Sequence, residues 1–207
     1  ESESSARFDV ECSVPTELAD ARIVLSRDGD LYSERLDGSD RIRLTTTGAA
    51  AGPSVSRDGS RIAYVAGFPT TWNGDIHIMN VDGTNDRALT TSAEAFDPSF
   101  SPDGGSVAFV DGSIWSGALR IRSLGTGEVT ELLASGNNSQ VAWSPDGRRL
   151  AFRRYSLDDA PGIYILDVDG RHPALFAPQS DSPVWSPDSG TLAYSADGVV
   201  HLRALDG

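Results

Sequence analysis

Three irregular segments of the sequence carry aromatic and charged side chains of the kind that bind ligands. The candidate binding residues are Phe68, Trp72, Trp115, Tyr155, Arg154, Asp158 and Asp159. Trp and Tyr are the residue types most enriched at binding hot spots, because a large ring fills a pocket at little cost in conformational entropy. The carboxylates and the guanidinium beside them add polar contacts. We therefore predict a binding face for a protein partner or a small ligand.

Catalytic and metal-binding motifs are missing from the sequence. It contains no G-x-S-x-G, no H-E-x-x-H and no phosphate loop with its lysine. His77 and His201 each lie five residues before the Asp of an Asp-Gly turn, where Tyr32 and Tyr164 stand in other parts of the chain. The position thus takes a large ring for structural reasons. We predict no catalytic residues, no metal site of histidines, and a protein that is not an enzyme.

The charge of the chain limits its partners. Its formal net charge is −13, and all 17 basic residues are Arg. Such a surface repels polyanions, which excludes nucleic acid as a partner. No apolar run reaches the roughly 20 residues that a membrane-spanning helix needs, so we expect no direct membrane insertion of this segment. Cys12 is the single cysteine and cannot form an intrachain disulfide.

The elements that must position these residues repeat along the chain. The turn sequence S-R/P-D-G/S recurs with its serine at Ser56, Ser101, Ser144 and Ser186, a spacing of 45, 43 and 42 residues. A strand-like run precedes each turn and another follows it. A third run ends at a second turn, usually D-G, and a weaker fourth run comes after that turn. Four short antiparallel strands per unit of about 42 residues are typical of a blade of a β-propeller.

We predict an all-β protein, a β-propeller of about five four-stranded antiparallel blades around a central channel. The pattern P-x-W-S-P-D-G-x-x-I-A-F, followed by I-Y-x-x-x-x-D-G, resembles the TolB-type (WD-like) propeller repeat over residues ~20–207. The resemblance implies a binding scaffold that acts outside the cytoplasm, in the periplasm or at the cell surface. It transfers no catalytic residue, because the repeat itself carries none.

The predicted organisation is an acidic tail at 1–7 followed by one propeller domain at 8–207. Its repeat units are ~8–46, 53–91, 97–133, 140–177 and 182–207. Segment 8–14 supplies either the inner strand of the first blade or the outer strand of the last blade. A truncated ring of six blades is the alternative.

The connections after the second strand of each unit differ from blade to blade, whereas the S-R/P-D-G/S turns are uniform. Because rigid scaffolds carry function on variable loops, we place the binding face on the variable connections after the second strands, near the mouth of the channel. The bulky residues before the turn serines are expected to pack between blades; they are Val55, Phe100, Trp143 and Trp185.

We predict no cofactor. The acidic runs 37–40, 82–86 and 167–169 lack the twelve-residue spacing and closing Glu of a calcium loop. If Ca²⁺ binds, the channel or Asp158 and Asp159 would hold it. Two rival functions remain: a five-bladed carbohydrate-binding protein or glycoside hydrolase, and the propeller domain of a larger sensor protein or peptidase.

Overall fold

The computed structural model describes residues 21–67, 73–113, 115–134, 136–155, 160–169 and 172–206. These residues form eighteen β-strands and no helix. Accordingly, the described part of the chain offers no helix with the length and apolar character required to cross a membrane.

The strands form five antiparallel sheets in chain order. The first sheet holds β1 (Arg22–Arg27), β2 (Asp30–Arg35) and β3 (Ile42–Arg43), and the second holds β4 (Ala50–Val55), β5 (Arg61–Ala66), β6 (Asp75–Asn80) and β7 (Arg87–Ala88). The third holds β8 (Ala95–Phe100), β9 (Ser106–Asp111), β10 (Ala118–Ser123) and β11 (Val129–Leu133). The fourth holds β12 (Asn137–Trp143), β13 (Arg149–Tyr155), β14 (Gly162–Asp167) and β15 (Ala174–Pro178), and the fifth holds β16 (Asp181–Trp185), β17 (Thr191–Ala196) and β18 (Val199–Ala204).

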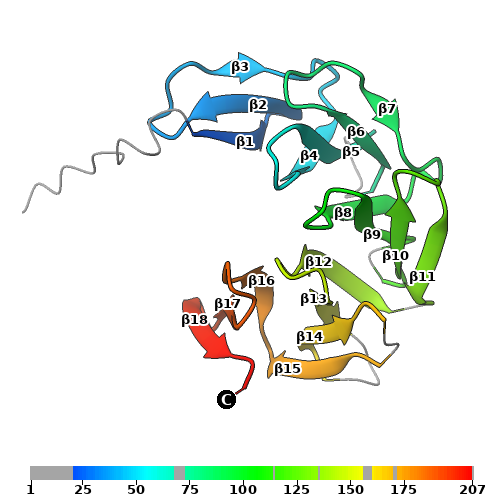
Figure 1. The fold of residues 1–207 in the computed structure, drawn as a ribbon, viewed down its shortest axis with the longest axis vertical. Coiled ribbons are helices and arrows are strands. Elements are labelled where there is room, and N and C mark those ends of the chain that lie inside the picture. The colour runs from blue at the N-terminus through cyan, green and yellow to red at the C-terminus, as the bar shows by residue number, and fades with distance from the viewer. Residues whose placement is uncertain are drawn as a thin grey trace, which may run out of the picture.

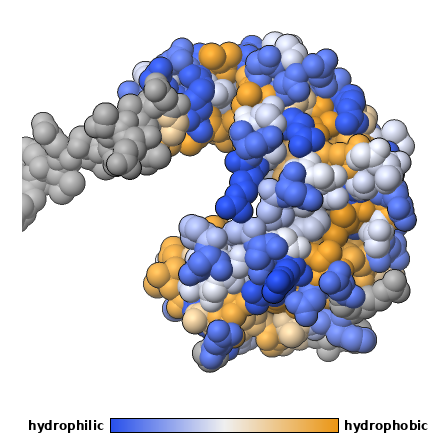
Figure 2. Space-filling view, in the orientation of Figure 1, coloured by the Kyte–Doolittle hydropathy of each residue, from blue (hydrophilic) through white to orange (hydrophobic). Residues whose placement is uncertain are grey.

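The five sheets are the blades of a β-propeller, which confirms the predicted fold class. Figure 1 shows them following one another around an arc, with β4, β8, β12 and β16 on the inside and β7, β11 and β15 on the rim. The surface is hollowed at the centre of the arc (Figure 2). The first and last sheets lie at the two ends of the arc. Segment 8–14, predicted to complete one of them, lies outside the described residues.

The apolar face of each blade is covered by its neighbour. The largest core cluster joins the second, third and fourth sheets through residues such as Ala63, Val107 and Leu150. Smaller clusters connect the first sheet to the second and the fourth to the fifth, around Leu31 and Leu192. Burial of these side chains is the main stabilising contribution, because a single sheet cannot cover both of its faces.

The uniform turn owes its shape to a serine and an aspartate. Ser56 Oγ donates to Asp58 Oδ1 at 2.6 Å, and Gly59 N donates to the Ser56 carbonyl at 2.8 Å. Hydrogen bonds from Ser56 and Ser60 lower the pKa of Asp58 to about 2. The same Ser–Asp hydrogen bond forms in the other three turns.

The last turn has a serine where the other three turns have a glycine. Gly59, Gly104 and Gly147 have φ of 70°, 69° and 77°, and Ser189 takes the same position with φ of 61°. The hairpin backbone is therefore the same in all four turns. Ser189 Oγ accepts a hydrogen bond from Asp146 N at 3.0 Å, which compensates for the left-handed backbone of a residue with a side chain.

Aromatic pairs fill the position shared by the histidines. His77 pairs across the strands with Tyr64, with ring centroids 5.6 Å apart, and His201 pairs with Tyr194 at 5.4 Å. His77 Nδ1 also lies 3.1 Å from Asp86 Oδ1. Each histidine ring thus packs against a tyrosine of the neighbouring strand, as expected for a structural position.

The bulky residues before the turn serines only partly fulfil the prediction of packing between blades. Phe100 is buried in the large cluster, at 7% exposure. Trp143 and Trp185 are half-buried against the core, and Val55 is 41% exposed. The difference arises because these residues end the innermost strands, where one side of each faces the mouth of the channel.

Candidate binding face at the variable loops

Each inner strand carries a β-bulge at the same place. The ladder register shifts after Ala51, Phe96, Ser139 and Asp181. The residue that follows each shift has a left-handed backbone: Gly52, Asp97, Gln140 and Ser182, with φ between 52° and 58°. A bulge turns the bulged residue out of the regular pleat and re-aims its side chain. These residues therefore lie on the channel side of the blades.

Hydrogen bonds join the bulges from blade to blade. Asp97 Oδ2 accepts a hydrogen bond from Gln140 N at 2.5 Å, and Gln140 Oε1 accepts one from Ser182 N at 2.8 Å. Burial raises the pKa of Asp97 above its ordinary value, although the hydrogen bond from Gln140 N opposes this shift. The carboxyl group of Asp97 is thus a polar group that the fold holds in a poorly solvated place.

The loop with Trp115 joins β9 to β10 and is held by its neighbours. Gly112 N donates to the Glu94 carbonyl at 3.0 Å, and Asn138 Nδ2 donates to the Gly117 carbonyl at 2.9 Å. Ser113 Oγ accepts a hydrogen bond from Trp115 N at 3.2 Å. The indole itself is 72% exposed. A fixed backbone thus presents a large ring to solvent.

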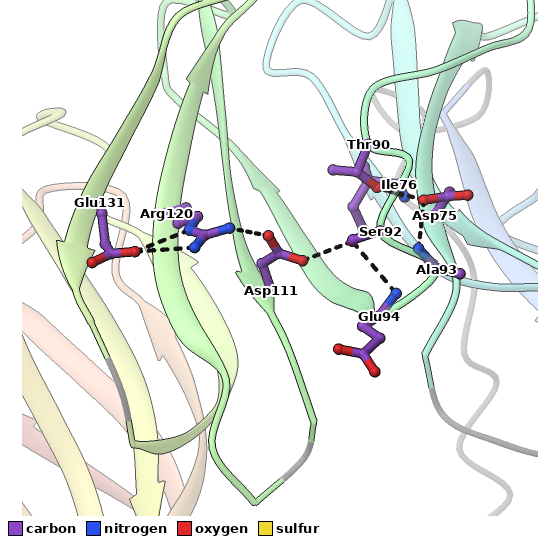
Figure 3. A network of polar contacts seen from close by, with 9 residues as sticks. All are labelled: Asp75, Ile76, Thr90, Ser92, Ala93, Glu94, Asp111, Arg120 and Glu131. Carbon is purple, nitrogen blue, oxygen red and sulfur yellow. Dashed lines mark hydrogen bonds and ion pairs between the residues drawn. The ribbon is translucent and has the colours of Figure 1, made fainter.

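Polar contacts tie this loop region to the preceding blade, as Figure 3 shows. Ser92 Oγ donates to Asp111 Oδ1 at 2.7 Å. Asp111 also pairs with Arg120, which reaches Glu131 Oε2 at 3.0 Å on its other side. The network spans β9, β10, β11 and the connection between β7 and β8. It fixes the strand ends from which the variable loops leave.

A neighbouring clamp, also in Figure 3, holds the connection before β8. Asp75 Oδ1 accepts hydrogen bonds from Thr90 Oγ1 at 3.1 Å and from Ala93 N at 3.0 Å. Asp30 and Thr45 repeat this arrangement one blade earlier. The recurrence shows that these carboxylates have a structural role in the blade.

A cavity of about 370 Å³ lies beside Trp115. Its lining residues are Phe96, Asp97, Trp115, Asn137, Ser139, Gln140 and Arg153. Two aromatic rings, one guanidinium, one carboxyl group, two amides and one hydroxyl group thus converge in a space of the size that small ligands occupy. The cavity can stack a flat or apolar group on the indole and fix it with directed hydrogen bonds.

Arg153 and Arg154 are adjacent in sequence but lie on opposite faces of their sheet. Side chains alternate along β13, so Arg153 and Tyr155 share one face of the fourth sheet and Arg154 lies on the other. The Arg153 guanidinium carbon is 5.9 Å from the Tyr155 ring centroid, next to the cavity. The Arg154 guanidinium carbon is 5.9 Å from the Tyr164 ring centroid instead.

Of the residues predicted for the binding face, Trp115 lines the cavity. Tyr155 lies next to it, in contact with the lining residue Arg153. Arg154 packs on the opposite side of its sheet. Phe68, Trp72, Asp158 and Asp159 lie outside the described residues. Asp97, Gln140 and Arg153 were not predicted for the face. A signal existed for the first two, because positions 52, 97, 140 and 182 keep the same spacing as the turn serines.

Acidic and histidine side chains do not gather into a possible metal site within the residues described. A Ca²⁺ site at the channel or at Asp158 and Asp159 stays a prediction that the structure does not test.

The model of the TolB β-propeller domain matches residues 60–199. No curated protein matches the chain. Many solved structures match the chain. One with high similarity is TolB from Acinetobacter baumannii, with a TM-score of 0.74 and 22% sequence identity. The match covers 86% of this chain and 46% of that one. The chain therefore spans about half the length of that relative.

Two further structures show the range of propellers that share this fold. A putative TolB from Agrobacterium tumefaciens has a TM-score of 0.77 at 21% identity, over 90% of this chain and 74% of that one. The oligogalacturonate lyase of Vibrio parahaemolyticus has a TM-score of 0.63 at 16% identity, over 84% and 53%. At these identities the structures establish the fold alone. The family model covers more than half of the sequence, and the chain belongs to the TolB β-propeller family.

Proposed function

We propose that this propeller is a non-catalytic binding scaffold that holds a protein partner or a small ligand at the variable-loop face. The observation that carries the proposal is the exposed indole of Trp115, presented by a hydrogen-bonded loop beside the 370 Å³ cavity. An exposed tryptophan on a rigid backbone loses little entropy when it is covered, which favours its use as a binding anchor.

The contacts of the cavity indicate what the partner would offer. A peptide or a small ligand could lay a flat or apolar group on Trp115 and direct a carbonyl or carboxylate to Arg153. Asp97 would accept a hydrogen bond from a donor on the same ligand.

We also infer that the protein acts outside the cytoplasm, on the basis of its resemblance to the TolB-type propellers. Fractionation of cells that express the full native reading frame tests this inference.

The experiment selects binders from a displayed library of random twelve-residue peptides and measures their Kd by calorimetry. We expect Trp115→Ala to weaken the selected peptides by about 30-fold, the factor that corresponds to a hot-spot loss of about 2 kcal/mol. Leu175→Ala is the control, because Leu175 is also exposed and apolar but lies on the outer strand β15. Equal binding by Trp115→Ala and by the unaltered protein would exclude this face.

A carbohydrate-binding or carbohydrate-cleaving function is the second candidate. Aromatic rings beside an arginine and two amides also suit a sugar, and an oligogalacturonate lyase shares the fold. A glycan array that includes acidic oligosaccharides separates the two functions. Strong binding or turnover on the array, lost in Trp115→Ala, would favour the second candidate over the peptide-binding scaffold.

A further inference from the structure

A second cavity of about 360 Å³ opens at the ends of the four inner strands, next to the uniform turns. Val55, Phe100, Trp143 and Trp185 end β4, β8, β12 and β16, and all four line it. The turn prolines Pro102, Pro145 and Pro187 complete the apolar part of its wall. The wall thus repeats one apolar position in four blades and one proline in three of them, and Arg57 takes the place of the proline in the second blade. Its volume lies within the range typical of small-molecule sites.

The two indoles present only their apolar surfaces to this cavity. Trp143 Nε1 donates to the Gly147 carbonyl at 3.1 Å, and Trp185 Nε1 donates to the Ala142 carbonyl at 3.0 Å. Both N–H groups are therefore already bonded within the protein, and the bonds hold the rings in place. A ligand gains burial and ring contacts from Trp143 and Trp185 but no hydrogen bond.

Arg57 is the one charged residue among those that line the cavity. Its Nη1 donates to the Pro145 carbonyl at 3.2 Å, a contact between the turns of the second and fourth blades. No ion pair of Arg57 is present within the part of the chain that the structure describes. Because a guanidinium has five N–H donors, most of its capacity is available to a carboxylate.

The carboxylates of the turns do not neutralise Arg57. Asp58 accepts from Ser56 and Ser60, and Asp146 accepts from Ser144 and from Arg148 N. These groups face solvent, where their repulsion of an anion is screened over about 10 Å at 0.1 M salt. A carboxylate in contact with Arg57 would be attracted at much shorter range.

We propose that this turn-face cavity is a second binding site, for a small carboxylate with an aromatic or aliphatic body. The apolar body lies against Trp143, Trp185 and the prolines, and the carboxylate pairs with Arg57. The positive charge of Arg57 decides the ligand class. A protonated amine would be repelled by the guanidinium, and a neutral group would leave the N–H donors of Arg57 without a charged partner. The site lies at the opposite ends of the inner strands from the variable-loop face and does not depend on it.

The test uses three probes of one shape: 4-phenylbutyrate, 4-phenylbutyramide and 4-phenylbutylamine. We expect the carboxylate to bind at least ten times more tightly than the amide, and the amine not to bind. In ¹H–¹⁵N spectra the indole N–H signals of Trp143 and Trp185 should shift on addition of 4-phenylbutyrate, while that of Trp115 stays in place. Equal binding of acid and amide, or a shift confined to Trp115, would overturn the proposal.

Two arginine variants isolate the proposed charge contact. Arg57→Gln should weaken 4-phenylbutyrate by at least tenfold and leave the amide unaffected. Arg148→Gln makes the same change of charge on the same face, but Arg148 is exposed and does not line the cavity, so it should retain the affinity. Equal losses in both variants would show a general effect of surface charge and refute the site. Peptide binding at Trp115 should be unchanged in both, so failure here is distinguishable from failure of the proposed function.

Discussion

Asp97 combines three features that one side chain rarely shows together: a left-handed backbone, a place on the cavity wall, and a pKa that burial raises. Ionisation of a carboxyl group is costly in such a place, and a fold selected for stability alone would favour a neutral group there. Strain and desolvation of this kind are typical of binding sites, where stability is given up for function. The combination supports the choice of this cavity as the candidate site.

Replacement of Asp97 by Asn should stabilise the protein at neutral pH. Asn tolerates the left-handed backbone and keeps an oxygen to accept from Gln140 N. The pKa of Asp97 is higher in the folded state than in the unfolded state, so between these two pKa values the folded state holds a proton that the unfolded state has lost. The stability of the wild type therefore falls as the pH rises from the ordinary pKa of 3.8 through the pKa of the folded state.

Urea unfolding of Asp97→Asn and wild type at several pH values measures this difference. The variant should be the more stable one at pH 7, and its advantage should shrink as the pH falls through the raised pKa of Asp97 towards 3.8. A variant that is less stable than wild type at pH 7 would mean that the charged form of Asp97 is favoured in the fold.

Residue types alone predicted the candidate site only in part. The exposure of Trp115 could be foreseen, because a tryptophan in a short variable loop has no neighbouring strand to cover it. Asp97 and Gln140 were missed, although their positions keep the repeat spacing, because their side chains face the channel only through the bulges. The bulge positions hold Gly, Asp, Gln and Ser and therefore have no common residue signature.

At the level of elements, the turns were the most predictable part of the chain, because their chemistry is local. A serine, an aspartate and a residue that accepts positive φ specify the hairpin within five positions. The exception, Ser189, shows that a contact with the preceding turn can replace glycine. Strand lengths were less predictable; the weaker fourth run of the second unit forms a strand, β7, of only two residues.

Glycine in the turn should be replaceable only at a cost. Gly59 has φ of 70° and open space around the position of an added Cβ, so Gly59→Ala introduces backbone strain without a clash. We expect a loss of about 1–2 kcal/mol in the free energy of unfolding. Gly125 is the matched control, because it also has open space but no positive φ. Gly125→Ala should be neutral or stabilise by about 0.4–1 kcal/mol. Equal effects of the two substitutions in chemical denaturation would contradict the argument.

For the molecule as a whole, the packing is between neighbours: the second, third and fourth sheets contact the ones before and after them, and the first and last sheets contact the second and the fourth. The repeat spacing made this arrangement predictable, because blades of equal size can bury their faces only against each other. The closure of the arc could not be derived in the same way, since it depends on which segment lies beside the first and last sheets and on no local pattern.

Neighbour packing implies a gradient of stability along the arc. The second, third and fourth sheets share the largest core cluster, with Phe152 fully buried in it, whereas β18 is exposed along its whole length. In such an array each sheet is stabilised by its own contacts and those with its neighbouring sheets.

Amides of β9 and β13 should therefore exchange with solvent most slowly, and those of β2 and β17 faster by at least tenfold. Phe152→Ala should cost about 3–5 kcal/mol and speed exchange in the central sheets. Uniform protection from β2 to β17 would instead show that the five sheets unfold as one cooperative unit.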